Sequence, residues 1–328
     1  VGARSLAMAN ATIAKVDDVT AGYWNPAGLN GITSDLQIGY MHNQYFAGIA
    51  KYDYGAIATR IDATTVIGFT PLLRFGVDDI PDTSELIDSD GNINYDRIKS
   101  FSAVDYAFLF SFAKKSKIEG LNLGANAKII YRKVGEFATA WGFGLDVGAQ
   151  YRIGTWRFGA VGRDITSTFN AWNFNTEKLE AVFTITGNEI PENSLEITLP
   201  RIILATGKEI ELSEKFSLYP EINLDVTLDG RRNVLLSGNP ISIDPHLGIE
   251  LGYNGFAYLR GGIGYIQKIK DFDGTENIIV QPNMGLGVKI KSIHIDYALT
   301  NIGQSVGLLS NVFSLKFDIN KKVNPDES

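Results

Sequence analysis

The side chains in this chain that could carry out chemistry are few and scattered. It has no cysteine and only three histidines, His42, His246 and His294. His294 lies two residues before Asp296, so a proton relay or hydrolytic pair could form, with a structural hydrogen-bond network as the simpler interpretation. Hydrolysis needs a nucleophile or an activated water beside an oriented base, and the histidines do not cluster to supply one. We therefore expect no enzyme activity, no disulfide and no thiolate metal site.

One short segment has the spacing of a calcium loop. Carboxylate and amide oxygens recur at Asp88, Asp90, Asn92 and Asn94 around the turn residue Gly91, and calcium prefers such ligands. The segment lacks the distal bidentate glutamate of an EF-hand, and an ordinary Asp-Gly turn explains it more simply. Beyond this weak calcium site, we expect no cofactor.

Composition and charge exclude several classes of protein. A net charge of −7, a pI near 5.1 and the lack of a clustered basic stretch argue against a nucleic-acid partner. With 45% hydrophobic residues the chain is too apolar for disorder. The longest nearly apolar stretch is 106–113, interrupted by Ser111, whereas a spanning helix needs about 20 residues. We expect a folded chain without a transmembrane helix.

Long segments of the chain alternate between apolar and polar residues. From Trp141 to Arg152, Trp, Phe, Leu, Val, Ala and Tyr occupy one parity, and Gly, Asp, Gln and Arg occupy the other. This alternation predicts a two-faced β-strand, and at about 3.4 Å per residue it reaches about 40 Å. Strands in soluble proteins are usually much shorter. Similar alternation occurs at 121–132, 216–228, 293–300 and 313–320.

The polar parity indicates what surrounds these strands. The apolar parity could face either the core of a soluble β-sandwich or the hydrocarbon of a bilayer. The polar parity is rich in Gly, Asn and charges of both signs, whereas the outer face of a sandwich is usually rich in Lys, Glu and Thr. This composition favours a crowded polar lumen. We predict an all-β fold, a transmembrane antiparallel β-barrel of about fourteen strands, with a soluble sandwich adhesin as the alternative.

The expected connections alternate in length, as they do in outer-membrane barrels. The expected strands are 35–43, 49–61, 65–74, 102–115, 121–134, 138–153, 155–163, 198–211, 215–229, 242–254, 256–270, 278–291, 293–301 and 311–319. Long connections such as 75–101 and 164–197 alternate with short turns and face outward if the amino terminus is periplasmic. Segments 75–100 and 164–197 each carry a net charge of −5, which suits a cation or basic partner and is also ordinary for solvated loops.

Charged residues on the polar parity are expected to line the lumen. Burying unpaired charge is costly, so opposite charges should pair there. We predict a mixed-sign network that holds an amino-terminal segment inside the barrel. The predicted members are Lys128, Arg132, Asp146, Arg152, Glu221, Asp225, Lys289, His294 and Asp296.

The first residues do not alternate and form a separate element. Residues 2–29 are rich in small side chains and are broken at Pro26, which lacks an N–H and restricts the preceding residue to extended or turn geometry. Such a segment suits a compact plug. The stretches Gly-Ala-Arg-Ser-Leu-Ala-Met (2–8), Asp-Asp (17–18) and Tyr-Trp-Asn-Pro-Ala-Gly-Leu (23–29) resemble the FadL-like outer-membrane barrels, most closely the PorV/PorQ group of Bacteroidota. Segments 293–299 and 313–317 resemble the last two strands of that group.

The resemblance implies a fourteen-stranded barrel in the bacterial outer membrane with its amino-terminal segment in the lumen. We expect a plug or hatch at 1–32, the barrel at 33–320 and a short polar tail at 321–328. The expected plug and gate residues are Arg4, Met8, Asp17, Asp18, Tyr23, Trp24, Asn25, Pro26 and Leu29.

Two functions follow from the resemblance. In the first, the protein is a non-enzymatic subunit of a larger outer-membrane machine, PorV-like, in type IX protein export or outer-membrane assembly. It would bind other outer-membrane or secreted proteins through 75–101 and 164–197, and its polar loops favour this function. In the alternative, it is a FadL-type passive channel for hydrophobic small molecules, with Met8, Tyr23, Trp24 and Leu29 lining a gate. Either protein would lie in outer-membrane lipid.

Overall fold

A computed structural model gives the fold of the 328-residue chain. It describes every residue except 46–47, 84–85, 87–90, 187–188, 190, 193, 271–273, 302–308 and 322–328. Most of the expected tail, 321–328, therefore lies outside the described residues. Among the described residues, no helix combines the length and apolar character needed to cross a bilayer.

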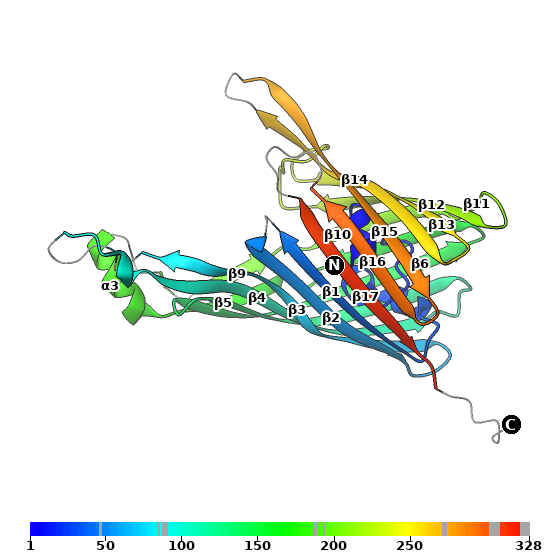
Figure 1. The fold of residues 1–328 in the computed structure, drawn as a ribbon, viewed down its shortest axis with the longest axis horizontal. Coiled ribbons are helices and arrows are strands. Elements are labelled where there is room, and N and C mark those ends of the chain that lie inside the picture. Colours follow the sequence, from blue (N-terminus) through cyan, green and yellow to red (C-terminus); the bar gives the residue numbers. More distant parts are fainter. Residues whose placement is uncertain are drawn as a thin grey trace.

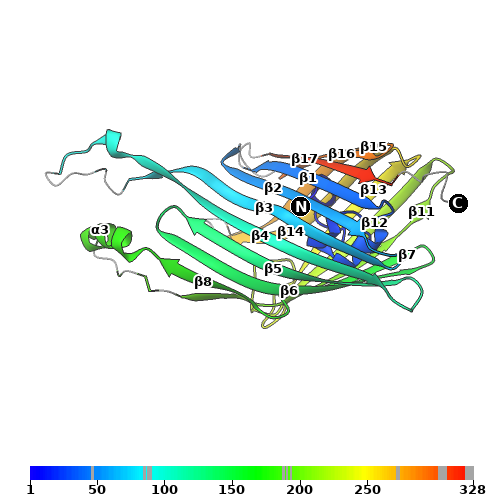
Figure 2. The same ribbon diagram turned by 90° about the horizontal axis from the view of Figure 1, so that it is seen from below.

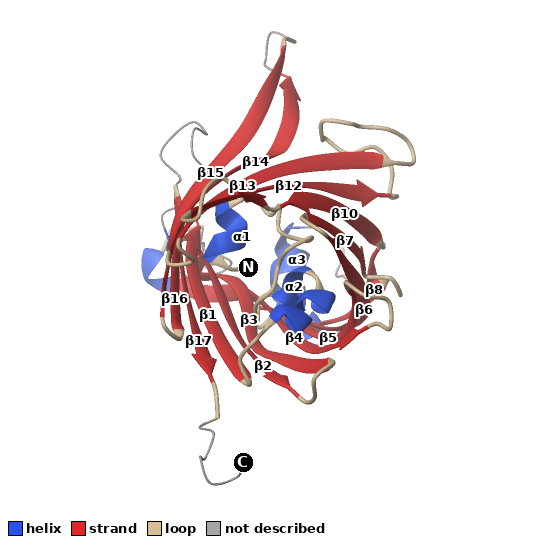
Figure 3. Cartoon of the chain, turned by 90° about the vertical axis from the view of Figure 1, so that its right-hand side faces the viewer, coloured by secondary structure: helices blue, strands red, loops and turns tan. Residues whose placement is uncertain are grey.

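The strands form one antiparallel sheet that closes into a barrel (Figure 3). β1 (Leu36–Tyr45) pairs with β17 (Ser310–Ile319), which completes a ring of fourteen strands. The other segments are β2 (Ala50–Arg60), β3 (Thr65–Asp82), β4 (Lys99–Lys115), β5 (Leu121–Val134), β6 (Ala138–Ile153), β7 (Trp156–Arg163), β8 (Thr168–Phe174), β9 (Leu195–Thr198), β10 (Arg201–Lys208), β11 (Ile210–Glu211), β12 (Phe216–Thr227), β13 (Ser242–Tyr253), β14 (Ala257–Lys270), β15 (Glu276–Ile290) and β16 (Ile293–Thr300). The predicted barrel is confirmed, and the sandwich alternative is wrong because a single closed sheet has no second sheet to cover its apolar face.

Two of the fourteen strands are interrupted. β7 and β8 both pair with β6, and the chain between them contains Asp164 and Ser167, whose φ angles of 54° and 57° break the extended backbone. The facing strand is divided into β9, β10 and β11. The expectation that 164–197 is a plain connection was therefore wrong. This segment contains β8, the helix α3 (Thr176–Thr186) and β9, because the wall continues past the break.

The apolar parity faces outward along the strands, which are strongly tilted (Figure 2). In β6, Trp141 is 57% exposed, whereas Asp146 on the opposite parity is 4% exposed. In β17, Phe313 is 56% exposed and Lys316 is 7% exposed. A belt of outward apolar side chains around a polar interior is what a bilayer-spanning barrel requires.

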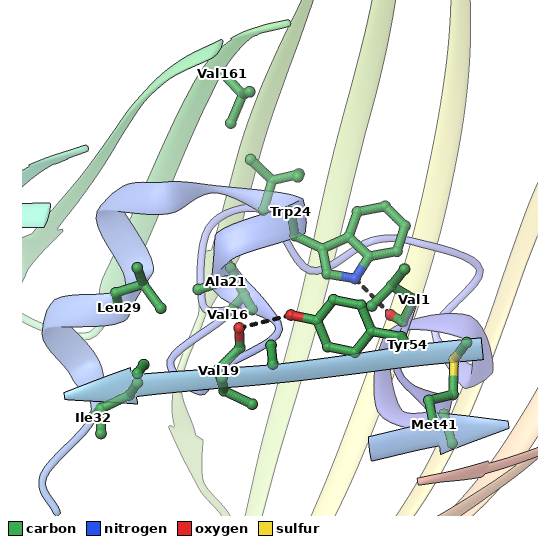
Figure 4. Packing of buried hydrophobic residues seen from close by; sticks show 14 of the residues in the cluster. Val1, Val16, Val19, Ala21, Trp24, Leu29, Ile32, Met41, Tyr54 and Val161 are labelled. Carbon is green, nitrogen blue, oxygen red and sulfur yellow. Dashed lines mark hydrogen bonds between the residues drawn. The ribbon is translucent and has the colours of Figure 1, made fainter. Parts of the chain in front are cut away.

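The amino-terminal segment, residues 1–32, lies within the ring (Figure 3). It contains the helices α1 (Ala3–Ala7) and α2 (Ala21–Trp24) and the 3₁₀ helix η1 (Pro26–Gly31). The apolar core of the molecule lies between this segment and the wall (Figure 4). The Trp24 indole N–H donates to the Val1 carbonyl oxygen at 2.6 Å, and the Tyr54 hydroxyl donates from the wall to the Val19 carbonyl oxygen at 3.0 Å.

Glycines on the inner face let this segment approach the wall closely. A Cβ atom at Gly124 would overlap the backbone of Pro26 and Ala27, and one at Gly148 would overlap the side-chain oxygen of Asn25. These backbone approaches explain why glycine occupies the polar parity of β5 and β6. These glycines therefore form the surface of β5 and β6 against which η1 packs, and we call it the seat of η1.

The two ends of the barrel differ. One end carries short turns, such as those between β6 and β7 and between β15 and β16, and we call it the short-turn end. At the opposite, long-loop end, α3 and the β3–β4 connection extend well beyond the ends of β1 and β2 (Figure 1). The connection includes a short 3₁₀ helix, η3 (Tyr95–Arg97).

Candidate functional site

A buried network of charges fills the lumen near the short-turn end. Arg260 Nε lies 2.7 Å from Glu250 Oε2, and its Nη1 lies 2.6 Å from Asp296 Oδ1. Arg4 Nε lies 2.9 Å from the same Glu250 oxygen. Lys316 pairs with Asp18 and lies 3.5 Å from Asp296. The network joins α1 and the 17–18 pair to β13, β14, β16 and β17, and its charges satisfy one another inside the barrel.

Sequence reasoning identified part of this network. Asp296 was expected on the wall, and Arg4, Asp17 and Asp18 were expected in the plug; Arg4 Nη1 also lies 3.0 Å from Asp17. It missed three partners, which are Glu250, Arg260 and Lys316. A signal was present, since each lies on the polar parity of a predicted strand. Alternation alone does not say which strands meet across a lumen.

A second charged cluster lies where β7 is interrupted. Lys128 Nζ lies 2.7 Å from Asp146 Oδ1 and 2.5 Å from Asp164 Oδ1. The Asp164 backbone N–H also donates to Asp146, at 2.9 Å. Asn126 connects this cluster to the amino-terminal segment, because its amide donates to the Gly22 carbonyl oxygen at 2.7 Å. The cluster therefore fixes the break in the wall and touches α2.

The remaining predicted network residues lie apart from one another. Arg132 pairs with Asp105 at 2.9 Å and Glu196 at 2.8 Å. The Arg152 side chain is 58% exposed and reaches Glu209 at 4.0 Å. His294 contacts Asp318 at 2.8 Å, Lys289 is exposed beside the same end of the lumen, and Asp225 lies 3.7 Å from Arg201. These five residues do not join the two clusters described above.

Hydrogen bonds from the wall hold the middle of the amino-terminal segment. The Ala14 backbone N–H donates to Glu221 Oε1 at 2.8 Å, and the Tyr219 hydroxyl donates to the other Glu221 oxygen at 2.7 Å. The Gln150 amide donates to the carbonyl oxygens of Ile13 and Val16 at 3.1 and 2.9 Å. Residues 13–16 are thereby attached to β6 and β12.

The expected gate residues occupy distinct positions. Met8 and Leu29 are fully buried. The Asn25 amide donates to the Ile13 carbonyl oxygen at 3.1 Å and to the Ala149 carbonyl oxygen at 3.0 Å, and its own oxygen accepts from Ala27 N–H. Pro26 is buried as the first residue of η1.

Arg163 holds the aromatic pair of α2. Its guanidinium donates to the Tyr23 carbonyl oxygen at 2.9 Å and lies 4.7 Å from the centre of the Tyr23 ring and 5.5 Å from that of Trp24. The two rings meet edge to face at 5.0 Å. Cation–π contacts of this kind stabilise an arginine that is largely removed from water. Sequence reasoning missed Arg163, which is the last residue of β7.

Two cavities lie on opposite sides of the amino-terminal segment. The first, which we call the long-loop cavity, has a volume of about 430 Å³ and is lined by Asn10, Ile13, Tyr23 and Trp24 on the side of the segment. The second, the short-turn cavity, has a volume of about 250 Å³ and is lined by Arg4, Lys15, Asp17 and Asp18. Ile13 lines the first cavity and Lys15 lines the second, so along this part of the chain only Ala14 lies between the two linings.

The predicted calcium site is only partly described. Asp88 and Asp90 lie outside the described residues. Asn94 Oδ1 accepts from the Asp96 N–H at 3.0 Å and so begins η3. Within the described part of the chain, no group of three or more histidines, aspartates or glutamates could hold a metal ion.

Each histidine lies in a different place. His42 contacts Asp53 at 2.7 Å, His246 lies 3.5 Å from Asp244, and His294 contacts Asp318. The pair His294 and Asp296, considered from the sequence, does not form, because Asp296 is bound by Arg260. Each histidine therefore belongs to a separate local contact.

Comparison with known proteins identifies the fold. No protein-family model and no curated protein sequence matches the chain. The CymD monoaromatic hydrocarbon channel matches with a TM-score of 0.59 and 12% identity over 98% of each chain. The toluene transporter TodX of P. putida matches with a TM-score of 0.59 and 14% identity, over 98% of this chain and 99% of that one. A FadL homologue of Pseudomonas aeruginosa matches with a TM-score of 0.53 and 12% identity over 97% and 98%.

The chain has the fold of the FadL-type outer-membrane barrels. This fold and the outward apolar belt place it in the bacterial outer membrane. The similar solved structures are channels and transporters rather than enzymes.

Proposed function

We propose that this FadL-type barrel is a passive outer-membrane channel in which residues 1–32 act as the plug. The observation that carries the proposal is the pair of cavities on the two sides of this segment, of about 430 and 250 Å³. A solute that enters the long-loop cavity meets Ile13 and the α2 aromatics, and beyond them lies the short-turn cavity. The likeness to hydrocarbon channels supports the same function.

The plug is held by contacts that a small movement can break. Residues 13–16 are attached to the wall through the Ala14 N–H, through two backbone carbonyl oxygens and through the longer ion pairs of Lys15 with Glu209 at 3.6 Å and Glu250 at 3.8 Å. Each such hydrogen bond contributes only about 0.5–1.5 kcal/mol net, because water can replace the partner. A local shift of residues 13–16 would connect the two cavities while the charge network near Arg4 keeps the segment in the barrel.

Because the chain lacks cysteine, thiol labelling can test the proposal. Tyr23 lines the long-loop cavity and Asp17 lines the short-turn cavity. In oriented proteoliposomes, a small membrane-impermeant thiol reagent added on the long-loop side should label Tyr23→Cys immediately. It should label Asp17→Cys about tenfold more slowly, because the open form is a minor state.

Ser292→Cys serves as the orientation control, since Ser292 is exposed in the turn between β15 and β16. The rate for Asp17→Cys is corrected for any Ser292→Cys labelled from the long-loop side. Complete protection of Asp17→Cys from that side, with rapid labelling from the other side, would rule out passage through the lumen. Equal rates for Asp17→Cys and Tyr23→Cys would show that residues 1–32 are no barrier.

A second candidate function is the subunit role in an export or assembly machine. The observation that favours it is the extension of α3 and of the described part of the β3–β4 connection beyond the ends of β1 and β2 (Figure 1); Ile93 and Tyr95 in this connection are strongly exposed. Apolar side chains outside the bilayer are available to a protein partner. Extraction in mild detergent followed by native mass measurement should then recover a complex. A barrel that is always solitary would count against this role.

A further inference from the structure

Most of the residues that line the long-loop cavity have a side chain that can form hydrogen bonds. Three arginines, two aspartates and three asparagines line it, and Ile13, Ile203 and Val234 are its only aliphatic residues among those described. Its volume of about 430 Å³ is in the range of small-molecule sites. A hydrocarbon placed here would remove water from the polar groups and return no hydrogen bond, which costs free energy at each group.

The charges around the long-loop cavity are balanced. Arg232 Nε donates to Asp229 Oδ1 at 2.8 Å, and this hydrogen bond lowers the pKa of the Asp229 carboxyl. Arg201 lies 3.7 Å from Asp225. Of the two remaining charged residues, Arg163 donates to the Tyr23 carbonyl oxygen at 2.9 Å, and Asp244 Oδ2 lies 3.5 Å from His246 Nε2. Counted together with Asp229, which pairs with Arg232 from outside the lining, three carboxylates match the three arginines, so these six groups carry no net charge.

Several buried polar atoms on the lining residues have no hydrogen-bond partner among the described residues. They are Arg163 Nε, which is a donor, Asn223 Oδ1 and Asp244 Oδ1, which are acceptors, and His246 Nδ1. Arg163 is 7% exposed and Asn223 is 1% exposed, so bulk water does not readily form hydrogen bonds with their buried polar atoms. These atoms themselves have almost no accessible surface, but the lining as a whole mixes arginine donors, aspartate acceptors and asparagine amides. A hydroxyl group can both donate and accept, and several hydroxyls on one molecule would match this mixture of lining groups.

A β-bulge adds an aromatic ring to the same cavity. The pairing of β14 with β15 shifts between Gly264 and Gln267, and Tyr265 has a φ of 50°. By alternation with Ile263, Tyr265 would face the lipid, but the bulge brings its hydroxyl to the Asn10 amide at 2.9 Å. Bulges commonly redirect a side chain toward a functional site. Tyr265 thus joins Tyr23 and Trp24 in the lining.

We infer that the long-loop cavity binds a neutral, polyhydroxylated small molecule of the monosaccharide or disaccharide class. The amide, carboxylate and guanidinium groups meet its hydroxyls, and the rings of Tyr23, Trp24 and Tyr265 meet its C–H faces. This inference rests on the proposed channel function, because it names the class of solute that the channel takes up. It differs from the hydrophobic small molecules expected from the sequence, since the cavity holds few aliphatic groups.

The test is binding to the full-length protein in detergent, measured by calorimetry. The probes are four neutral disaccharides (sucrose, maltose, lactose and trehalose), toluene as the hydrocarbon and benzoate as the anion. At least one disaccharide should bind, while toluene and benzoate should not bind measurably. Asp244→Asn and Tyr265→Ala should each weaken that binding by about tenfold or more, because each removes hydrogen-bonding or ring contact with the solute.

Asp105→Asn is the matched control, since Asp105 is a carboxylate on the inner face that pairs with Arg132 and does not line the cavity. It should leave disaccharide affinity unchanged, and retained resistance of the barrel to detergent unfolding shows that each variant is folded. Binding of toluene alone, or of no disaccharide at 100-fold excess over protein, overturns the inference. Loss of affinity in Asp105→Asn equal to that in Asp244→Asn overturns the assignment to this cavity.

Binding and passage are separable. If a disaccharide binds with the expected effects of the variants but never crosses the membrane of proteoliposomes, the binding site is supported and the channel function is ruled out. Toluene that crosses while no disaccharide binds supports the channel and removes the inference.

Discussion

Replacing Lys316 with methionine should destabilise the folded protein by about 3–5 kcal/mol, because it leaves the buried carboxylate of Asp18 without its main cation. Lys316 is 7% exposed and pairs with Asp18 and with Asp296. Methionine fills a similar volume, so the loss reports the charge rather than a cavity. Urea denaturation of the protein in detergent micelles, followed by the change in gel mobility of the barrel, gives the free energy of unfolding.

Lys289→Met is the matched control for this substitution. Lys289 lies at the same end of the lumen but is exposed, so its removal should change the free energy of unfolding by less than about 0.5 kcal/mol. The double variant Lys316→Met/Asp18→Asn should recover part of the stability, since it removes the uncompensated charge. Equal effects of Lys316→Met and Lys289→Met would show that the buried network does not stabilise the fold.

Gly124→Ala should displace η1 from the wall at a cost of about 1–3 kcal/mol, since the added methyl group has no room and the obstacle is backbone. The new Cβ would overlap the backbone of Pro26 and Ala27. The displaced plug should expose the short-turn cavity, so labelling of Asp17→Cys from the long-loop side should approach the rate of Tyr23→Cys. The thiol-labelling assay described above measures this change.

Gly261→Ala provides the comparison in the same kind of wall. A Cβ atom at Gly261 would lie 3.8 Å from its nearest neighbour, a side-chain carbon of Ile249, which is an ordinary contact. This variant should leave the labelling rates unchanged and should be neutral or slightly stabilising, by up to about 1 kcal/mol, because alanine restricts the unfolded chain. Unchanged labelling in Gly124→Ala would mean that η1 is not needed to close the lumen.

These two variants act on different parts of the plug attachment. Lys316 belongs to the charge network that fixes α1 and the 17–18 pair, while Gly124 belongs to the seat of η1. Between them, residues 13–16 are held by hydrogen bonds to β6 and β12 and by Lys15, whose Nζ lies 3.6 Å from Glu209 and 3.8 Å from Glu250. In the proposed channel, we expect local opening at residues 13–16 without release of the whole segment.

The architecture could be predicted from sequence because one face of every strand meets lipid. Residues such as Trp141, Phe143 and Val147 must be apolar for that reason, and they are exposed on the outer surface while Asp146 is buried. The strong period-two pattern then fixes strand identity and parity, and long alternating segments fix the barrel. The non-alternating residues 1–32 stood out for the same reason, since they contact no lipid.

The long connection at 164–197 was harder to predict. Its pattern does not show that β8 continues the wall after the break at Asp164 and Ser167, because Asp164 at this break contacts Lys128 and Asp146, which lie far from it in the sequence. Tyr265 is a similar case, since only the bulge in β14 moves it from the lipid parity to the cavity.

The sequence by itself determined the barrel, the outward belt and the separate amino-terminal segment, because alternation is a local property that each strand carries alone. Only the tertiary structure decided that Arg260 joins Glu250 to Asp296 and that Arg163 holds Tyr23 and Trp24. It also decided that the long-loop cavity forms beside Ile13. These contacts join residues far apart in the chain across the lumen. They depend on strand tilt, register and the position of the plug, which no short stretch of sequence contains.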